Sequence, residues 1–323
     1  MKIGILIASL MALPLLGPGA AHAQADWPTK PIRFIAPFAT GGPLDQASRA
    51  VAPRLAELLG KPVIVENVAG AGSTLGVARV AQSEPDGHTI GLAHVGSLSM
   101  APHMYDKLAY DPLKSLSPIT LVSDYVNVLV VKADEPYQTV ADLLRAAREN
   151  PGKLTYGSSG IGSSNHLSGE LLASMAGVQM THVPYKGSAP SMVDLIGGRL
   201  NFMFDVLLNS MPHIQSGKLR VLGVTNLDGV SALPGIAPIA NTIPGYEVLG
   251  WVAVVGPAGM PRPVVDRLNA EFARIMKMPD VVKSFAGIGF DSRTSTPEQL
   301  HALIDKDLKL WGPIIRSAGV KAN

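Results

Sequence analysis

Short apolar runs alternate with segments of helical periodicity along the first hundred or so residues. Runs at 32–36, 63–66 and 89–93 predict three strands. Apolar positions at helical spacing over 47–58 and 73–83 predict the helices between them. This order of strand, helix, strand, helix and strand is typical of a parallel sheet covered by helices, so we expect an α/β unit.

A second unit of the same kind begins near residue 126. Its helices include one opened by a capping box at Thr139 and Asp142, and one with Leu167 and Leu171 on a single face. Its apolar runs predict five strands, at 126–131, 154–157, 180–183, 200–204 and 219–225. We therefore expect a second α/β domain over 126–225.

The rest of the chain predicts a return to the first unit. Residues 226–245 carry three prolines and are expected to form an extended connection to a strand at 251–255. An amphipathic helix from Val264 to Ile275 follows, and a last helix starts at a Thr296 N-cap. The expected first domain is thus discontinuous, 24–125 plus 226–323, with two strands crossing a hinge and a mainly parallel sheet in each domain.

The N-terminus has the three parts of a secretory signal peptide. Lys2 is positive, residues 5–16 are apolar, and the small–x–small pattern Ala21-His22-Ala23 follows. Twelve apolar residues interrupted by Pro14 are too short for about 30 Å of hydrocarbon, which disfavours a retained membrane anchor. We expect residues 1–23 to be removed after Ala23 and the mature protein to be periplasmic.

Composition excludes several classes of protein. The 323 residues have a formal net charge of +2 and no basic run, so nucleic acid is not an expected partner. The chain has no Cys, which excludes thiolate metal sites and thiol nucleophiles, and we expect no metal or cofactor. No P-loop, zincin or nucleophile-elbow motif occurs, so we expect no enzyme. One alternative stays open, an exported α/β hydrolase built from His166, a Ser and Asp205.

Two Gly/Ser-rich turns directly follow predicted strands and precede helices. One spans residues 37–45 and the other 157–164. Turns at the N-terminus of a helix present free backbone N–H groups that suit an anion, and glycine lets a ligand approach the backbone closely. Open α/β sheets bind ligands at the carboxyl ends of their strands, so we expect both turns to face one cleft. Ordinary turn chemistry is the alternative for either loop alone.

Candidate ligand-binding residues come from these turns and from other strand ends. Phe38 could instead pack in the core, Asp45 support its own loop, Ser97 cap a turn and His166 be structural. Lys186 could face solvent, and Asp205 could cap the helix that follows it or pair with a ligand amine. The full candidate set is Phe38, Ala39, Gly41, Gly42, Asp45, Ser97, Ser158, Gly160, Gly162, Ser163, His166, Lys186 and Asp205.

These motifs resemble one family, the Bug-type or tripartite tricarboxylate transporter substrate-binding receptors. The resemblance covers the whole mature chain and rests on ordered motifs: Pro37-Phe38-x-x-Gly41-Gly42-x-x-Asp45, Gly157-Ser-Ser-Gly160-Ile-Gly162-Ser163-Ser-x-His166-Leu167, His182-Val-Pro184-Tyr185-Lys186-Gly187-x-x-Pro190 and Gly217-Lys218-Leu219-Arg220-x-Leu222-x-Val224-Thr225. The start Trp27-Pro28-x-Lys30-Pro31 fits as well.

The resemblance implies a type II periplasmic-binding-protein fold with Venus-flytrap closure of its two domains. It further implies a monomeric receptor that captures a small carboxylate without a dedicated Arg. The ligand could be a di- or tricarboxylate, an aromatic acid or an acidic amino acid. The receptor would deliver it to integral membrane subunits of a transporter, and a receptor used for signalling is the other interpretation.

Overall fold

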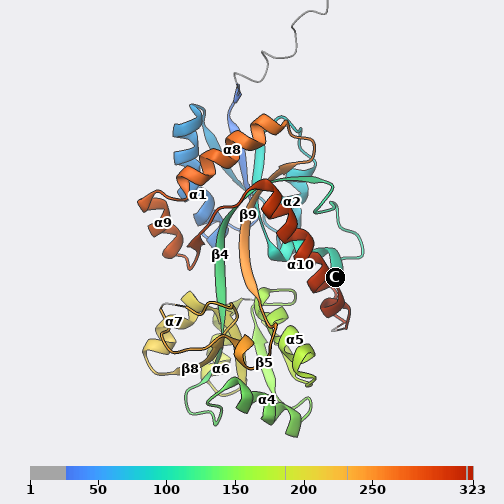
Figure 1. The fold of residues 1–323 in the computed structure, drawn as a ribbon, viewed down its shortest axis with the longest axis vertical. Coiled ribbons are helices and arrows are strands. Elements are labelled where there is room, and N and C mark those ends of the chain that lie inside the picture. Colours follow the sequence, from blue (N-terminus) through green and yellow to red (C-terminus); the bar gives the residue numbers. More distant parts are fainter. Residues whose placement is uncertain (1–26, 186, 231, 318, 323) are drawn as a thin grey trace, which may run out of the picture.

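The computed structural model describes residues 27–185, 187–230, 232–317 and 319–322. It has two lobes joined by long strands (Figure 1). The predicted signal peptide lies outside the described residues. Within those residues, no helix combines the length and the apolar character needed to cross a membrane.

The first lobe is built on the three strands expected near the N-terminus. β1 (Ile32–Ala36) lies between β2 (Val63–Asn67) and β3 (Thr89–His94), and both pairings are parallel. Their apolar positions are largely buried, Phe34 and Ile90 fully so. The carboxyl ends of these strands therefore open onto the same edge of the sheet, where ligands of α/β folds bind.

Two long strands run from one lobe into the other (Figure 1). β4 (Leu116–Lys132) and β9 (Leu249–Pro257) pair antiparallel from Leu116 with Pro257 to Val126 with Leu249. β9 continues the first-lobe sheet by pairing with β3, and the short β10 (Asp291–Ser292) pairs with β4. The sheet is therefore mixed, because the chain crosses between the lobes once in each direction.

The far end of β4 belongs to the sheet of the second lobe. There it pairs antiparallel with β7 (Phe202–Val206) and β8 (Leu219–Val224). β5 (Thr155–Ser158) pairs parallel with both β7 and β6 (Thr181–Pro184). The expected parallel pairs thus occupy the outer part of this sheet, and the strand shared by the lobes lies beside them.

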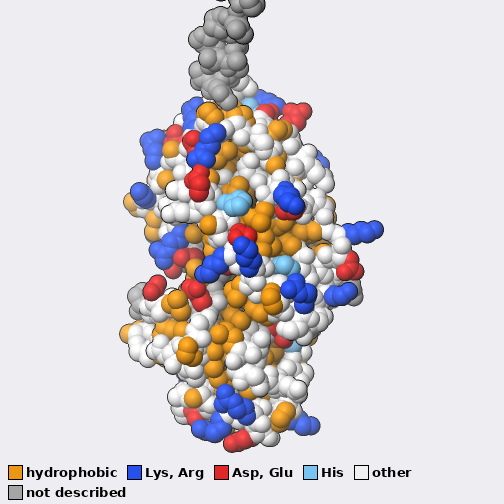
Figure 2. All heavy atoms as spheres, turned by 45° about the vertical axis from the view of Figure 1, so that its right-hand side comes forward, with side chains coloured by type: hydrophobic (Ala, Val, Ile, Leu, Met, Phe, Trp, Pro, Cys, Tyr) orange, Lys and Arg blue, Asp and Glu red, His pale blue; other side chains and the backbone are white. Residues whose placement is uncertain are grey.

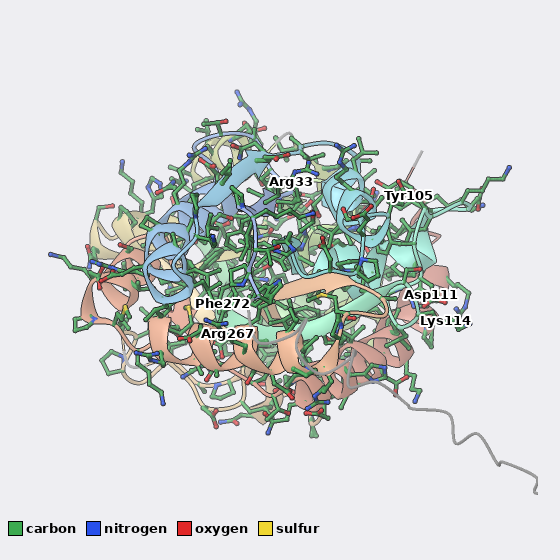
Figure 3. All side chains as sticks on the ribbon, turned by 90° about the horizontal axis from the view of Figure 1, so that it is seen from above. Arg33, Tyr105, Asp111, Lys114, Arg267 and Phe272 are labelled. Atoms are coloured by element: carbon green, nitrogen blue, oxygen red, sulfur yellow. The ribbon has the colours of Figure 1, made fainter. Side chains whose placement is uncertain are left out.

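Helices cover both faces of the first-lobe sheet. α1 begins at Pro43 and ends at Gly60, which adopts a left-handed conformation (φ 69°) and donates its N–H to Ala56. Figure 3 shows Phe272 of α8 on the inner side of its helix, where its ring meets Phe34 edge-on at 6.1 Å. The helices of this lobe are α1 (Pro43–Leu59), α2 (Thr74–Ala81), α3 (Ala101–Met104), α8 (Arg262–Ile275), α9 (Pro279–Ala286) and α10 (Pro297–Ser317).

The second-lobe helices begin as the sequence predicted. Thr139 accepts from the N–H of Asp142 and Asp142 accepts from the N–H of Thr139, so the predicted capping box is confirmed. The helices of this lobe are α4 (Val140–Glu149), α5 (Ser164–Ala176), α6 (Ser188–Ile196) and α7 (Leu207–Gln215).

The apolar core of the first lobe includes Trp251 and Trp311, both buried. The indole N–H of Trp251 donates to Asp307 of α10 at 2.7 Å, which gives this buried carboxyl a hydrogen-bond partner, while burial raises its pKa. On the face in Figure 2, Lys/Arg and Asp/Glu side chains are interspersed. That face shows no large patch of one sign, in keeping with the small net charge.

One boundary differs from the expected one. Residues 226–248 were expected to rejoin the first domain, but the structure packs them on the second lobe. The Tyr246 hydroxyl donates to Ser168 at 3.0 Å, its ring stacks on Phe204, and Val248 donates to Thr225. The chain therefore returns to the first lobe through β9, because the buried Tyr246 belongs to the second-lobe core.

Several elements were not predicted. The first half of β4 is one, because its apolar residues alternate with polar ones and Pro118 interrupts the pattern. The short α9, β10 and the helical segment from Gly96 to Met104 were also missed. Two of these missed segments contribute to the site described next.

Candidate functional site

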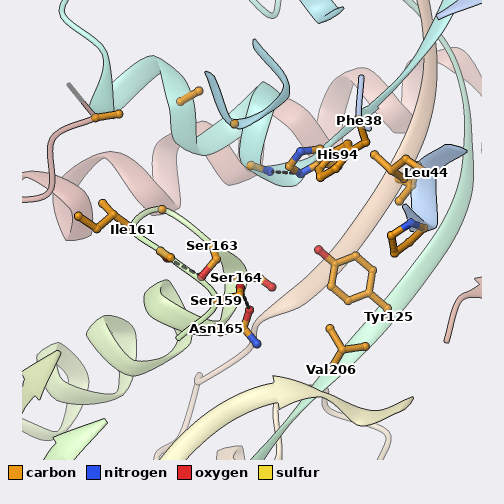
Figure 4. Close-up of a pocket in the computed structure, with 18 of the residues that line it drawn as sticks. Phe38, Leu44, His94, Tyr125, Ser159, Ile161, Ser163, Ser164, Asn165 and Val206 are labelled. Carbon is orange, nitrogen blue, oxygen red and sulfur yellow. Dashed lines mark hydrogen bonds between the residues drawn. The ribbon is translucent and has the colours of Figure 1, made fainter. Parts of the chain in front are cut away.

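A cavity of ≈ 430 Å³ lies between the lobes. The first lobe contributes the loop after β1, the start of α1 and the end of β3, while the second contributes the loop after β5 and the start of α5. Tyr125 of β4, Val252 of β9 and Phe290 complete it. Figure 4 shows Phe38, His94, Leu44 and Tyr125 facing the loop that carries Ser159, Ile161 and Ser163.

Asp45 holds the first-lobe loop in place. Its carboxylate accepts from the N–H of Gly41 at 2.8 Å and from the Asn67 amide at 2.9 Å. Arg49 approaches it at 2.9 Å. Hydrogen bonding to Arg49, with smaller contributions from Gly41 and Asn67, lowers the pKa of Asp45 to about 2 despite its burial. Asp45 therefore supports the loop as an ionised group and does not line the cavity.

The second-lobe loop is held by its own side chains. Gly160 donates its N–H to the Ser158 hydroxyl at 3.1 Å, and Gly162 donates its N–H to Nδ1 of His166 at 3.1 Å. Both glycines have positive φ values, 137° and 77°. Ser163 is the N-cap of α5, where its hydroxyl accepts from the N–H of His166.

These bonds correct the expected roles of the glycines. The two turns were expected to present free N–H groups to an anion, but those of Gly41, Gly160 and Gly162 are already bonded within their loops. Among the described residues that line the cavity, Ser164 and Asn165 lie in the first turn of α5, where their N–H groups have no partner within the helix. The positive end of α5 therefore faces the cavity.

His94 is a cavity residue that the sequence analysis missed. Its Nδ1 accepts from the N–H of Gly96 at 3.0 Å, so the proton lies on Nε2, 2.7 Å from the Ser73 hydroxyl. Its ring packs against Phe38 with the centroids 5.6 Å apart. Burial lowers the pKa of His94 to about 4, so the ring is neutral near pH 7. Its position at the carboxyl end of β3 was the signal that could have identified it.

Two stacked histidines lie behind the loop that leads into α5. His166 stacks on His182 with the ring centroids 3.8 Å apart, and Nε2 of His182 lies 2.7 Å from the Ser158 hydroxyl. Glu170 lies 3.5 Å from His166 and accepts a 2.5 Å hydrogen bond from Tyr156. Burial, together with the neighbouring His166, lowers the pKa of His182 to about 4.

Acidification to pH 4.5 is expected to destabilise the fold by a few kcal/mol, because His94 and His182 bind protons more weakly in the folded protein than in the unfolded chain. Their stabilising effect is complete above the unfolded pKa of 6.5 and is lost as pH falls towards 4. Urea unfolding at pH 7 and pH 4.5 measures it, with His94→Gln as a variant that should show a smaller pH dependence. Equal midpoints at both pH values would contradict this prediction.

The structure places the predicted site residues differently from one another. Phe38, Gly160, Gly162 and Ser163 line the cavity. The first-lobe loop is shaped by Ala39, Gly41, Gly42 and Asp45. Three further residues are buried behind the cavity wall and form hydrogen bonds within their own lobes: Ser97, Ser158 and His166. Asp205 is buried in a polar network that reaches the cavity lining through Asn165, and Lys186 lies outside the described residues.

Asp205 belongs to the interior of the second lobe. Its carboxylate accepts from the hydroxyls of Ser188 at 2.6 Å and Ser210 at 3.3 Å, and from the Asn209 amide at 3.4 Å. Burial raises its pKa. The capping interpretation is wrong, because α7 has Val206 as its N-cap and no side-chain cap.

Asp205→Asn is expected to change ligand affinity by no more than about twofold, since the carboxylate does not line the cavity. Calorimetric titration of both forms with the same ligand measures this. A loss of tenfold or more would show that Asp205 acts on the ligand.

The geometry does not support the hydrolase alternative. The ring nitrogens of His166 face the N–H of Gly162 and the carboxylate of Glu170, so neither is placed to activate a serine. In the part of the chain that the structure describes, no group of three or more His, Asp or Glu residues is placed to hold a metal ion.

Comparisons with known proteins agree on the kind of molecule. A family model described as "Tripartite tricarboxylate transporter family receptor" matches residues 47–320. A Pseudomonas sp. protein, "UPF0065 protein in tcbD-tcbE intergenic region", is 38% identical over 299 residues, which cover 92% of this chain and 89% of that protein.

Two solved structures are similar over most of the chain. The periplasmic binding protein BugD has a TM-score of 0.74 at 34% identity, covering 91% of this chain and 99% of that one. The R. palustris protein Rpa4515 with adipate has a TM-score of 0.76 at 32% identity, with the same coverage. The mixed α/β fold with flanking helices is thus that of periplasmic binding proteins.

Proposed function

The chain belongs to the family of tripartite tricarboxylate transporter receptors, and on that premise we propose that it captures a small carboxylate in the cavity between its lobes. Solved relatives are periplasmic binding proteins, and one of them was solved with adipate. The observation that carries the proposal is the first turn of α5, whose free N–H groups at Ser164 and Asn165 line that cavity.

The carboxylate binds at this helix end together with nearby hydroxyl groups. Ser164 and Tyr125 both line the cavity, and burial raises the pKa of Tyr125. Both hydroxyls therefore remain protonated and can donate to the ligand. Capture of this kind uses a helix dipole and uncharged donors in place of an arginine.

Closure of the lobes around the ligand completes the proposed mechanism. The hinge lies where β4 and β9 pass between the lobes, near Val126 and Leu249. We propose a first domain of residues 24–125 plus 249–323 and a second domain of residues 126–248. The second crossing of the chain between the domains thus moves from residue 226 to β9. A ligand drives closure only if it binds the closed form more tightly, and contacts from both lobes satisfy this condition.

The receptor delivers its ligand to integral membrane transporter subunits and has no catalytic activity of its own. It acts as a monomer in the periplasm after removal of residues 1–23. Mass spectrometry of the exported protein tests the cleavage after Ala23, and light scattering tests the monomer.

A thermal-shift screen over small mono-, di- and tricarboxylates, followed by calorimetry, tests the function. A ligand present at about 100 times its Kd stabilises the folded state by about 2.7 kcal/mol, which raises Tm by several degrees. The corresponding neutral amides, which keep the shape and lose the charge, are the control. If no acid binds, or amides bind equally well, the proposal is wrong.

A further inference from the structure

We infer that the ligand is a monocarboxylate with an apolar, ring-sized body, an aromatic acid foremost. This inference rests on the proposed function and specifies the ligand class that the same cavity takes. The cavity has one polar end and one apolar end, and the two ends come from different elements.

The polar end is formed mainly by the second lobe, with the Tyr125 hydroxyl of β4 as a further polar group. The loop after β5 and the first turn of α5 supply the side chains of Ser159, Ser163, Ser164 and Asn165. Two of these groups are already used, since Ser159 donates to Asn165 at 2.7 Å and Ser163 donates to the Gly160 carbonyl at 2.7 Å. What remains, the N–H groups and the hydroxyl at the start of α5, is enough for one carboxylate.

The facing walls are apolar and aromatic. Phe38 packs against His94, and Tyr125 stacks on Phe290 with the centroids 5.6 Å apart and the planes at 21°. Leu44, Val206 and Val252 also line the cavity. Apolar walls with two aromatic pairs favour a flat apolar body, because burying it removes apolar surface from water.

A second charge on the ligand would have no charged partner on these walls. The described lining residues include no Lys, Arg, Asp or Glu, and the one imidazole, that of His94, is neutral near pH 7. The acidic residues nearest in sequence to the lining already have partners. Asp45 accepts from Gly41 and pairs with Arg49, and Asp205 accepts from Ser188. Burying an unpaired carboxylate or ammonium is costly, so dicarboxylates and amino acids should bind more weakly.

The volume also fits this class. At ≈ 430 Å³, the cavity lies in the lower part of the range of small-molecule sites, with room for a single ring and its carboxylate.

Calorimetry on the mature protein with matched pairs of acids tests the inference. Benzoate and terephthalate share a ring and differ by one carboxylate, while phenylacetate and phenylalanine differ by an ammonium group. We expect the first member of each pair to bind at least about tenfold more tightly, a difference of about 1.4 kcal/mol. Adipate, a dicarboxylate without a ring, should also bind more weakly than benzoate.

The outcomes separate this inference from the proposed function. If adipate or terephthalate binds more tightly than benzoate, the ligand class is wrong and carboxylate capture stands. If phenylalanine binds more tightly than phenylacetate, the cavity recognises an ammonium group and the ligand class is again wrong. If none of the acids binds, both the inference and the proposed function fail.

A pair of variants tests the apolar wall directly. Val206 lies on the wall at the end of β7, and its side chain is only partly buried, so a longer side chain can be accommodated. Val206→Lys adds a cation there, and Val206→Gln is the uncharged control of similar length. We expect the lysine variant to shift the ratio of terephthalate to benzoate affinity about tenfold in favour of terephthalate. An unchanged ratio relative to the glutamine variant would overturn the placement of the ligand body against this wall.

Discussion

Gly162→Val is expected to weaken ligand binding by at least about 100-fold, about 2.7 kcal/mol, while leaving the protein folded. Gly162 adopts φ +77°, a conformation that a β-branched residue avoids, and a Cβ atom there would lie 2.6 Å from the sulfur of Met104 on the opposite lobe. Its N–H is also bonded to His166. The substitution therefore displaces the loop that leads into the first turn of α5, and with it the donors of the carboxylate. Calorimetry measures the affinity, and circular dichroism confirms the fold.

Gly177→Val is the matched control for this prediction. Gly177 ends the same helix, also has positive φ (+62°), and would place its Cβ with nothing within 4 Å. It therefore imposes comparable backbone strain far from the cavity, and should lower Tm without changing the affinity. Normal binding by Gly162→Val, or equal losses in the two variants, would show that the loop does not position the carboxylate.

Asp45→Ala is expected to weaken ligand binding about tenfold and to lower the free energy of unfolding by about 2 kcal/mol. The buried carboxylate accepts from the N–H of Gly41 and from Asn67, so its removal leaves both donors unsatisfied and releases the loop that carries Phe38. Urea unfolding and calorimetry measure the two effects.

Glu57→Ala on the exposed side of α1 is the control, because its carboxylate is largely exposed and pairs with Arg54 of the same helix. This substitution should change neither the ligand affinity nor the free energy of unfolding measurably. The pH dependence provides a second check. The pKa of Asp45 is lowered to about 2, so its contribution should persist to about pH 4 and be lost only as the pH falls from there towards 2. An Asp45→Ala variant with unchanged affinity would limit this residue to a purely structural role.

The regular part of the fold could be predicted from the sequence because local signals coincide there. The alternation of buried strands and amphipathic helices placed β1, β2, β3 and β5, and Thr139 with Asp142 marked the start of α4. The length of β4 could not be predicted, because its first half is stabilised by pairing with β9 and carries a proline and polar residues. Such a strand depends on contacts that are distant in the sequence.

The sequence predicted which loops form the candidate site, but it predicted only some of the residues and hydrogen bonds there. Positions after strands identified the turns that contain Phe38 and Gly162, which both line the cavity. The sequence could not show that the Gly162 N–H is bonded to His166, since that depends on a side chain one turn into the helix. Tyr125 and Phe290 were missed because no turn motif marks them, and only the fold places them beside the cavity.

The sharing of β4 between the two sheets has a consequence for folding cooperativity. Residues Leu116–Val126 of this strand pair with β9, and residues Asn127–Lys132 pair with β7 and β8. A segment expressed without β4 would expose the edge of one sheet and lose buried contacts such as those of Leu129 and Val131. The two lobes therefore should not unfold separately, even though the proposed closure moves them relative to one another. Because each sheet is complete only when β4 is folded, the protein should unfold on heating in a single transition despite its two lobes.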